Sequence, residues 1–251
     1  MNPHVNLSVQ NKVGTIEFFH PKSNSLPGNL LKKLTESISE SSDREDIRVV
    51  ILRSGGNRAF CAGASFDELM KIEDVDTGKE FFSGFANVIN AVRKCPKFII
   101  GRVQGKAVGG GVGMVAATDY CFASKSASVK LSELAIGIGP FVVGPAIERK
   151  MGMSAFSQLT INATKWQTAQ WAKEKGLYSE IYDTIEEMDV AILALAEKLA
   201  SSNPESMRGL KEIMWDGTDH WDELLMERAK ISGKRVLSDF TLKTIAKLKK
   251  S

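Results

Sequence analysis

Glycines that follow apolar, strand-like runs give the first indication of chemistry in this sequence. Gly109, Gly110 and Gly111 come after an apolar run at 97–103 and open a helix-like apolar segment at 112–117. Glycine lets a ligand approach the main chain closely, and a helix that begins there leaves unpaired N–H groups directed at the ligand. Such a turn can bind an anion, although close helix packing through small residues is the commoner explanation of a lone glycine triplet.

A second turn of small residues makes a binding function more plausible than packing alone. The stretch AFCAGA (59–64) follows another apolar run at 47–52, just as the glycine triplet follows the run at 97–103. If these two runs are neighbouring strands of one sheet, the turns bring two bare main-chain N–H groups to the same edge. Two convergent donors form an oxyanion hole, which stabilises the enolate or tetrahedral anion of a carbonyl compound.

Glu133 is an acidic residue whose neighbours along the chain are apolar. It lies among the apolar residues Leu131, Leu134 and Ile136. Burial among apolar side chains would raise its pKa toward that of a useful general base. A solvated or salt-bridged carboxylate is the alternative, as for most glutamates. We expect only structural roles for the side chains of four other acidic residues, namely Asp67, Glu68, Asp119 and Glu148.

The elements that must position these residues form an α/β pattern. Alternation over 13–19 predicts a strand, helical spacing from Leu30 to Ile38 predicts an amphipathic helix, and the apolar run at 47–52 predicts a buried strand. A helix over 79–93 and a strand over 97–103 follow. Two further short strands are expected at 120–123 and 128–131.

The rest of the chain reads mainly as helix, with one possible short strand at 178–181. We expect helices over 155–163, 168–175, 185–201, 205–214, 219–232 and 240–249. The prediction is therefore an α/β core over 1–180 and an all-helical region over 181–251. The apolar positions of this helical region must cover either the core or a neighbouring subunit.

Composition and charge exclude several other classes of protein. The 251 residues are 43% hydrophobic and 25% charged, and the net charge of +3 is spread too thinly for a nucleic-acid groove. The three cysteines and three histidines have no disulfide or metal-ligand spacing. No apolar run reaches membrane-spanning length, and no signal or transit pattern stands at the start. We expect a cytoplasmic protein without a metal site, membrane span or nucleic-acid partner.

Four motifs in order resemble the enoyl-CoA hydratase/isomerase family, also called the crotonase superfamily. They are HPKSNSL (20–26), AFCAGASFDEL (59–69), VQGKAVGGGVGMVAATD (103–119) and SELAIGIGP (132–140). The resemblance implies an α/β, crotonase-like spiral of ββα units with a C-terminal all-helical trimerisation region. It also implies an acyl-CoA thioester as substrate, no metal or redox cofactor, and assembly as a homotrimer or a dimer of trimers.

The resemblance assigns roles to individual residues. The oxyanion donors fall on the main-chain N–H groups of Ala64 and Gly110. The CoA moiety falls on Lys22, Ser23 and the segment that contains Ala62, Ala64, Ser65, Phe66 and Asp67. The family usually has Asp where this chain has Ser65, so a side-chain contact there is in doubt. Phe141, Val142 and Val143 are expected to line or back the acyl pocket, with ordinary core packing as the alternative. Phe240 and Lys250 resemble in spacing the residues with which the family's last helix contacts the CoA nucleotide, often that of a neighbouring subunit.

The catalytic carboxylates decide between reactions. Typical hydratases of the family use two glutamates, and the corresponding positions here are Gly113 and Glu133. One carboxylate suffices to move a double bond, because it can take a proton from the α-carbon of a 3-enoyl thioester and return it to the γ-carbon. The dienolate oxygen would lie between Ala64 and Gly110. The sequence thus resembles most the single-glutamate Δ3,Δ2-enoyl-CoA isomerases of the family.

Two alternatives remain open at this point. The first is a hydratase, or another enolate reaction such as hydrolysis or decarboxylation, with a water, bicarbonate or substrate carboxylate in the space that Gly113 opens. The second is a non-catalytic acyl-CoA-binding or assembly protein that has kept the fold and lost the second glutamate.

Overall fold

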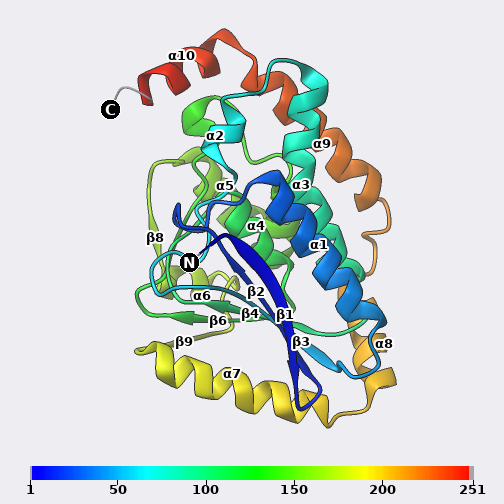
Figure 1. The fold of residues 1–251 in the computed structure, drawn as a ribbon. Helices are drawn as coiled ribbons and strands as arrows, with labels where there is room; N and C mark the ends of the chain where they lie inside the picture. The colour runs from blue at the N-terminus through cyan, green and yellow to red at the C-terminus, as the bar shows by residue number, and fades with distance from the viewer. Residues whose placement is uncertain (1, 249–251) are drawn as a thin grey trace.

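A six-stranded sheet forms the centre of the protein, of which the computed structural model describes residues 2–248 (Figure 1). Its strands stand in the order β1-β2-β3-β4-β6-β9. Their bounds are β1 His4–Gln10, β2 Val13–Phe19, β3 Val49–Ser54, β4 Ile99–Val103, β6 Tyr120–Ser124 and β9 Glu180–Tyr182. The edge strand β1 is antiparallel to β2, and every later pairing in this sheet is parallel. Parallel strands need a crossover through another element, which the helices supply.

A smaller sheet runs beside the first and gives the fold its repeating unit. It consists of β5 (Ala107–Val108), β7 (Ser128–Lys130) and β8 (Gln167–Thr168), and single bridges extend it from Ala107 to Cys61 and from Ala64 to Leu26. The chain repeatedly passes from a strand of the large sheet to a segment of the small sheet and then into a helix. This is the predicted spiral of ββα units, and the fold class is confirmed.

Helices cover both faces of the large sheet, as its uninterrupted apolar strands require. On one face lie α1 (Gly28–Asp43), α3 (Val75–Lys94) and α4 (Gly110–Ala117), which share the main apolar core with the strands. On the other face α7 (Ile185–Ala200) packs through Met188 and Ile192 (Figure 1). A further helix, α9 (Trp221–Val236), lies along α3. These C-terminal helices therefore cover the chain's own core.

The remaining helices complete the surface around the predicted site. They are α2 (Phe66–Leu69), α5 (Gly144–Ile161), α6 (Ala169–Glu174), α8 (Pro204–Met214) and α10 (Asp239–Leu248), together with a short 3-10 turn, η1 (Leu134–Ile136). Within residues 2–248, no helix combines the length and the apolar character that crossing a membrane would require.

Several predicted elements differ from the structure in their bounds. The helix predicted at 155–163 is the end of α5, which already begins at Gly144 and is interrupted at Gly152, where φ is +79°. The helix predicted at 79–93 begins at Val75, because Asp74 and Thr77 form a capping box. The strands β1, β5 and β8 were not predicted.

Candidate active site

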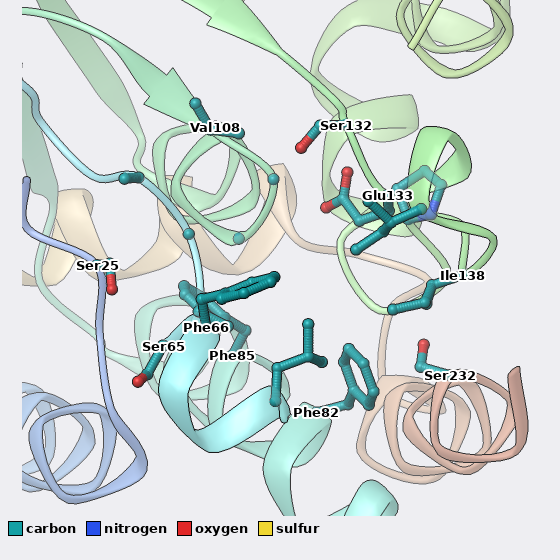
Figure 2. A pocket seen from close by; sticks show the side chains of 18 of the residues that line it. Ser25, Ser65, Phe66, Phe82, Phe85, Val108, Ser132, Glu133, Ile138 and Ser232 are labelled. Atoms are coloured by element: carbon teal, nitrogen blue, oxygen red, sulfur yellow. The ribbon is translucent and has the colours of Figure 1, made fainter. Parts of the chain in front are cut away.

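A cavity of about 500 Å³ lies where the predicted motifs meet (Figure 2). Its volume is in the range of small-molecule sites. The loop before α1, the turn before α2, the start of α4 and the turn that carries Glu133 all contribute to its wall. Helices α3 and α9 close the remaining side with Phe81, Phe82, Phe85 and Ser232.

Asn24 fixes the first of these loops. Its side-chain amide donates to the carbonyl oxygens of Gly55 and Ala59 at 3.0 and 2.9 Å, and its oxygen accepts from the N–H of His20 at 2.8 Å. Because Asn24 is 4% exposed, these bonds are shielded from water. The HPKSNSL loop is thereby fastened to the AFCAGA turn, which explains why two motifs far apart in the sequence share one wall of the cavity.

The predicted oxyanion donors have free N–H groups. Leu26 donates its N–H to the carbonyl of Gly63 at 2.8 Å, and Ser65 donates to the carbonyl of Leu26 at 3.0 Å. This parallel pairing turns the N–H of Ala64, which lies between them, away from Leu26. Gly110 is the first residue of α4, so its N–H has no partner within the helix. Among residues 2–248, neither N–H donates to another protein group.

The two turns lie against each other. A Cβ atom built on Gly63 would come within 3.9 Å of the amide nitrogen of Gly110, and one on Gly111 would come within 2.7 Å of the carbonyl oxygen of Cys61. Gly111 is therefore required for close packing, and Gly110 both lines the cavity and packs closely, since a Cβ atom on it would lie 2.4 Å from the ring of Phe85. Close packing and an exposed main-chain N–H group thus occur together in this turn.

Gly109 allows Glu133 to approach the turn. Its φ is +53°, a conformation that L side chains rarely adopt, and a Cβ atom there would lie 2.7 Å from Oε1 of Glu133. The carboxyl group of Glu133 is thus held directly beside the start of α4. Figure 2 shows it directed into the cavity.

The carboxyl group of Glu133 is desolvated and incompletely bonded. Although the residue as a whole is half-buried, its Oε2 atom is shielded from solvent and has no hydrogen-bond partner within the described chain. Burial, opposed only by a main-chain hydrogen bond, raises the pKa of Glu133 to about 7. A carboxyl group with this pKa can both accept and release a proton near neutral pH.

Asp67 and Lys22 form the mouth of the same cavity. Their side chains are 55% and 64% exposed and make an ion pair. Hydrogen bonding to Lys22 lowers the pKa of Asp67, so this carboxylate stays charged and solvated. Among the residues that line the cavity, Glu133 is therefore the one carboxyl group with a raised pKa.

The space expected beside Gly113 does not exist. A Cβ atom on Gly113 would lie 2.4 and 2.6 Å from Cγ1 and Cβ of Val143, and Gly113 itself is buried and does not line the cavity. The hypothesis of a water, bicarbonate or substrate carboxylate in a space at Gly113 is therefore wrong. Val143, thirty residues further along the chain, occupies it and presents an apolar surface to the cavity.

Most of the predicted site residues line this cavity. Their positions do not test what each residue does, so their individual roles stay predictions. They are Lys22, Ser23, Ala62, Ala64, Ser65, Phe66, Asp67, Gly110, Glu133 and Phe141. The hydroxyl of Ser65 accepts the N–H of Glu68 at 3.4 Å, so it caps α2. Phe66 is the next residue and is also the first residue of α2.

One predicted residue, Phe240, does not line the cavity. Phe240 is 63% exposed, and its ring packs on Gly137 in the turn after Glu133, where a Cβ atom would lie 2.5 Å from Cδ1 of the ring. Phe240 therefore attaches α10 to the turn that carries Glu133 instead of lining the cavity. Lys250 lies outside the described residues.

Sequence reasoning missed several lining residues. Phe82 and Phe85 lie on the predicted helix over 79–93, and helical spacing alone cannot distinguish a cavity from a packed interior. Ser25 and Ser132 lie within the quoted motifs but were assigned no role, and Ser232 carried no sequence signal, because serine is common in loops and on helix surfaces. The other unpredicted lining residues include Phe81, Val108, Ile136 and Ile138.

Comparisons with known proteins identify the family of this chain. The family model described as enoyl-CoA hydratase/isomerase matches residues 8–236. Mitochondrial methylglutaconyl-CoA hydratase of Mus musculus is 33% identical over 192 residues, which are 75% of this chain but only 60% of that relative. Mitochondrial Delta(3,5)-Delta(2,4)-dienoyl-CoA isomerase of Mus musculus is 26% identical over 233 residues, covering 85% of this chain and 68% of that relative.

The fold agrees as well. The crystal structure of an enoyl-CoA hydratase from Bacillus halodurans superimposes with a TM-score of 0.89 at 20% identity, over 97% of this chain and 99% of that one. At this identity the likeness shows the fold alone. Together with the family match over most of its length, it establishes that the chain belongs to the enoyl-CoA hydratase/isomerase family.

Proposed function

We propose that this protein is an enzyme that shifts the double bond of an enoyl-CoA thioester from the 3- to the 2-position, with Glu133 as the proton shuttle. The observation that carries the proposal is the position of one desolvated, incompletely bonded carboxyl group beside two free main-chain N–H groups. The cavity has room for a small acyl chain.

The reaction divides between these groups. The N–H groups of Ala64 and Gly110 bind the thioester oxygen and polarise the carbonyl. Glu133 takes a proton from the α-carbon, and the electron pair moves into a dienolate whose oxygen stays between the two donors. Glu133 then returns the proton to the γ-carbon, which leaves the double bond between the α- and β-carbons. Because the same carboxyl accepts and donates, a pKa near 7 suits both steps.

The surroundings of Glu133 support isomerisation over addition of water. A hydratase must hold a water molecule and deliver both its hydroxyl and a proton, a task that two carboxylates share in the family. Val143 fills the place where the second carboxylate would stand. The other carboxylate at the cavity, Asp67, is paired with Lys22 at the mouth.

Hydration of a 2-enoyl-CoA is the second candidate function. It is supported by the similarity to methylglutaconyl-CoA hydratase, which has the higher identity of the two relatives described above. On this alternative, Glu133 alone would activate the water.

For CoA binding and assembly we also propose what the family resemblance implies. Lys22, Ser23 and the segment from Ala62 to Asp67 would hold the CoA moiety, mainly through main-chain groups, and no metal or redox cofactor would take part. The protein would form a homotrimer or a dimer of trimers. Light scattering would test this assembly.

The function is tested by incubating the purified protein separately with a 3-enoyl-CoA and a 2-enoyl-CoA. Ultraviolet absorbance follows the conjugation of the double bond with the thioester. Absorbance that grows from the 3-enoyl substrate, with no loss from the 2-enoyl substrate, supports the isomerase. Loss from the 2-enoyl substrate alone supports the hydratase, and no change with either would contradict both.

A further inference from the structure

We infer that the acyl group of the substrate carries a neutral oxygen function, such as a hydroxyl or a carbonyl, at the end of the cavity where Ser232 lies. This inference rests on the proposed function, in that it takes the cavity to be an acyl-CoA site. The inference names the class of acyl group that the wall around Ser232 would select.

Ser232 presents a hydroxyl to the cavity and has no partner for it on the protein. The residue is 1% exposed and lines the cavity, and its side chain makes no hydrogen bond within residues 2–248, although its Oγ atom is not among the atoms fully shielded from solvent. A serine in a helix can satisfy its hydroxyl on the carbonyl of the preceding turn, but no such bond is formed here. Figure 2 shows the Ser232 hydroxyl directed from α9 into the cavity, near Ile138 and Phe82.

The position of Ser232 is rigid. The next residue, Gly233, lies where α9 crosses α3, and a Cβ atom there would come within 2.7 Å of the amide nitrogen of Lys79. Gly78 makes the reciprocal approach, with a Cβ atom 2.7 Å from Cα of Gly233. Contact between the main chains of the two helices leaves Ser232 little freedom to move toward another partner.

The wall around Ser232 is apolar and belongs to the acyl end of the cavity. Leu69, Ile138 and Val236 form a small buried cluster, against which Phe81 and Phe82 pack. Val236 lies one helical turn beyond Ser232 on the same face of α9. In Figure 2, Ser25 and Ser65 lie on the opposite side, toward the predicted CoA loops. A purely apolar chain end would leave the Ser232 hydroxyl dehydrated and unbonded, which is unfavourable.

The charged residues around the cavity argue against a substrate whose acyl group ends in a carboxylate. The charged residues that line the cavity are Lys22, Asp67 and Glu133, and Lys22 is paired at the mouth. A carboxylate beside Ser232 would therefore be buried without a cation. A neutral donor or acceptor is the chemistry that a single hydroxyl satisfies.

The test measures calorimetric Kd values for saturated acyl-CoA thioesters of four, six and eight carbons, each unsubstituted, ω-hydroxylated or ω-carboxylated. Saturated thioesters cannot undergo a double-bond shift, so the result is independent of the proposed reaction. For at least one length we expect the ω-hydroxy thioester to bind about fivefold to tenfold more tightly than its unsubstituted counterpart. We expect the ω-carboxy thioester of that length to bind more weakly than either.

Ser232→Ala should reduce the hydroxyl preference to about one. Ser25→Ala, which removes a hydroxyl on the opposite side of the same cavity, should leave it unchanged. Equal binding of hydroxylated and plain thioesters by the native protein would overturn the inference, as would equal losses in the two variants. Failure of every thioester to bind would overturn the proposed function as well.

Discussion

Two acidic side chains stand at opposite ends of α4, and their surroundings differ in almost every respect. Glu133 lies beside Gly109, at the start of the helix, with Oε2 buried and unbonded within the described chain. Asp119 lies just beyond the helix's last residue, and its side chain is 6% exposed. Both carboxyl groups are shielded from water, so burial alone does not distinguish them.

Hydrogen bonding distinguishes them. Asp119 accepts from the N–H of Ile99 at 2.7 Å, from Nζ of Lys211 at 2.8 Å and from Nε1 of Trp215 at 3.2 Å. Lys211 is itself buried and also donates to the carbonyl of Lys97. These bonds attach α8 to the sheet, which agrees with the structural role expected for Asp119. A buried carboxylate with a full set of donors is held in place, whereas one without them remains free to exchange a proton.

The largest expected effect is the loss of turnover on Glu133→Gln. The amide keeps the size of the side chain but cannot accept the substrate proton, so kcat should fall by about 10³-fold to 10⁴-fold. Affinity for a saturated acyl-CoA should stay within about threefold, because binding does not require a charge on Glu133. The exposed Glu148→Gln on α5 is the control. Turnover by Glu133→Gln within tenfold of the native value would remove it as the base.

Asp119→Asn should affect stability instead of turnover. It leaves the buried ammonium group of Lys211 without its carboxylate, which costs about 3–5 kcal/mol of the free energy of unfolding. Urea denaturation measures this loss, and Lys211→Met in the same chain should recover part of it. Activity per folded molecule should stay within about threefold. A large fall in kcat with unchanged stability would show that the contrast with Glu133 is incorrect.

Gly113 lies on α4, between the two carboxylates. Substituting it tests whether its packing against Val143 excludes a second base. Gly113→Ala would bring a methyl group into Val143, and overpacking of this kind costs about 1–3 kcal/mol. Val143→Ala in the same chain should relieve much of this cost, so a double-mutant cycle should give a coupling of about 1 kcal/mol. Additive effects would mean that the two residues do not compete for this space.

The pH dependence of turnover by the native protein tests Glu133 as the general base. The base must be deprotonated, so kcat/KM should rise about tenfold per pH unit below an inflection near 7 and then level off. A profile that stays level from pH 5 to 9 would contradict the raised pKa.

The same titration has a consequence for stability. A carboxyl whose pKa is higher in the folded than in the unfolded chain stabilises the fold when protonated. The contribution is complete below the ordinary value of 4.5 and is lost as the pH rises through about 7. Thermal unfolding should therefore show Glu133→Gln gaining stability relative to the native protein between pH 5 and pH 9. An unchanged difference would argue against desolvation of this group.

Sequence patterns predicted the strands and helices whose formation depends mainly on residues near one another in the chain. The alternation over 13–19 gives β2 its observed bounds, and the apolar run at 47–52 overlaps β3. The hairpin partner β1 was missed because its turn, Asn11-Lys12, adopts positive φ at both residues without a glycine. The strands β5 and β8 have two residues each and exist only through pairing with distant segments.

In the site as well, features set by neighbouring residues were predicted, and features set by distant packing were not. Small-residue turns after two strands located two segments of the site, and the family resemblance assigned Ala64 and Gly110 within them. The apolar neighbours of Glu133 predicted its burial. No local pattern could show that Val143 fills the place beside Gly113, because thirty residues separate them and only the packing of α5 against α4 brings them together. Ser232 escaped prediction for the same reason, since its burial depends on the crossing of α3 and α9.

The most direct test of a single proton shuttle follows deuterium from the α-carbon. A 3-enoyl-CoA with two deuterium atoms at the α-carbon would be converted in ordinary water, and mass spectrometry with NMR would locate the label in the product. Because the Glu133 carboxyl is shielded from solvent, we predict that a measurable fraction of the product carries deuterium at the γ-carbon. Product formed at full rate with no deuterium at the γ-carbon would contradict transfer by one buried carboxylate.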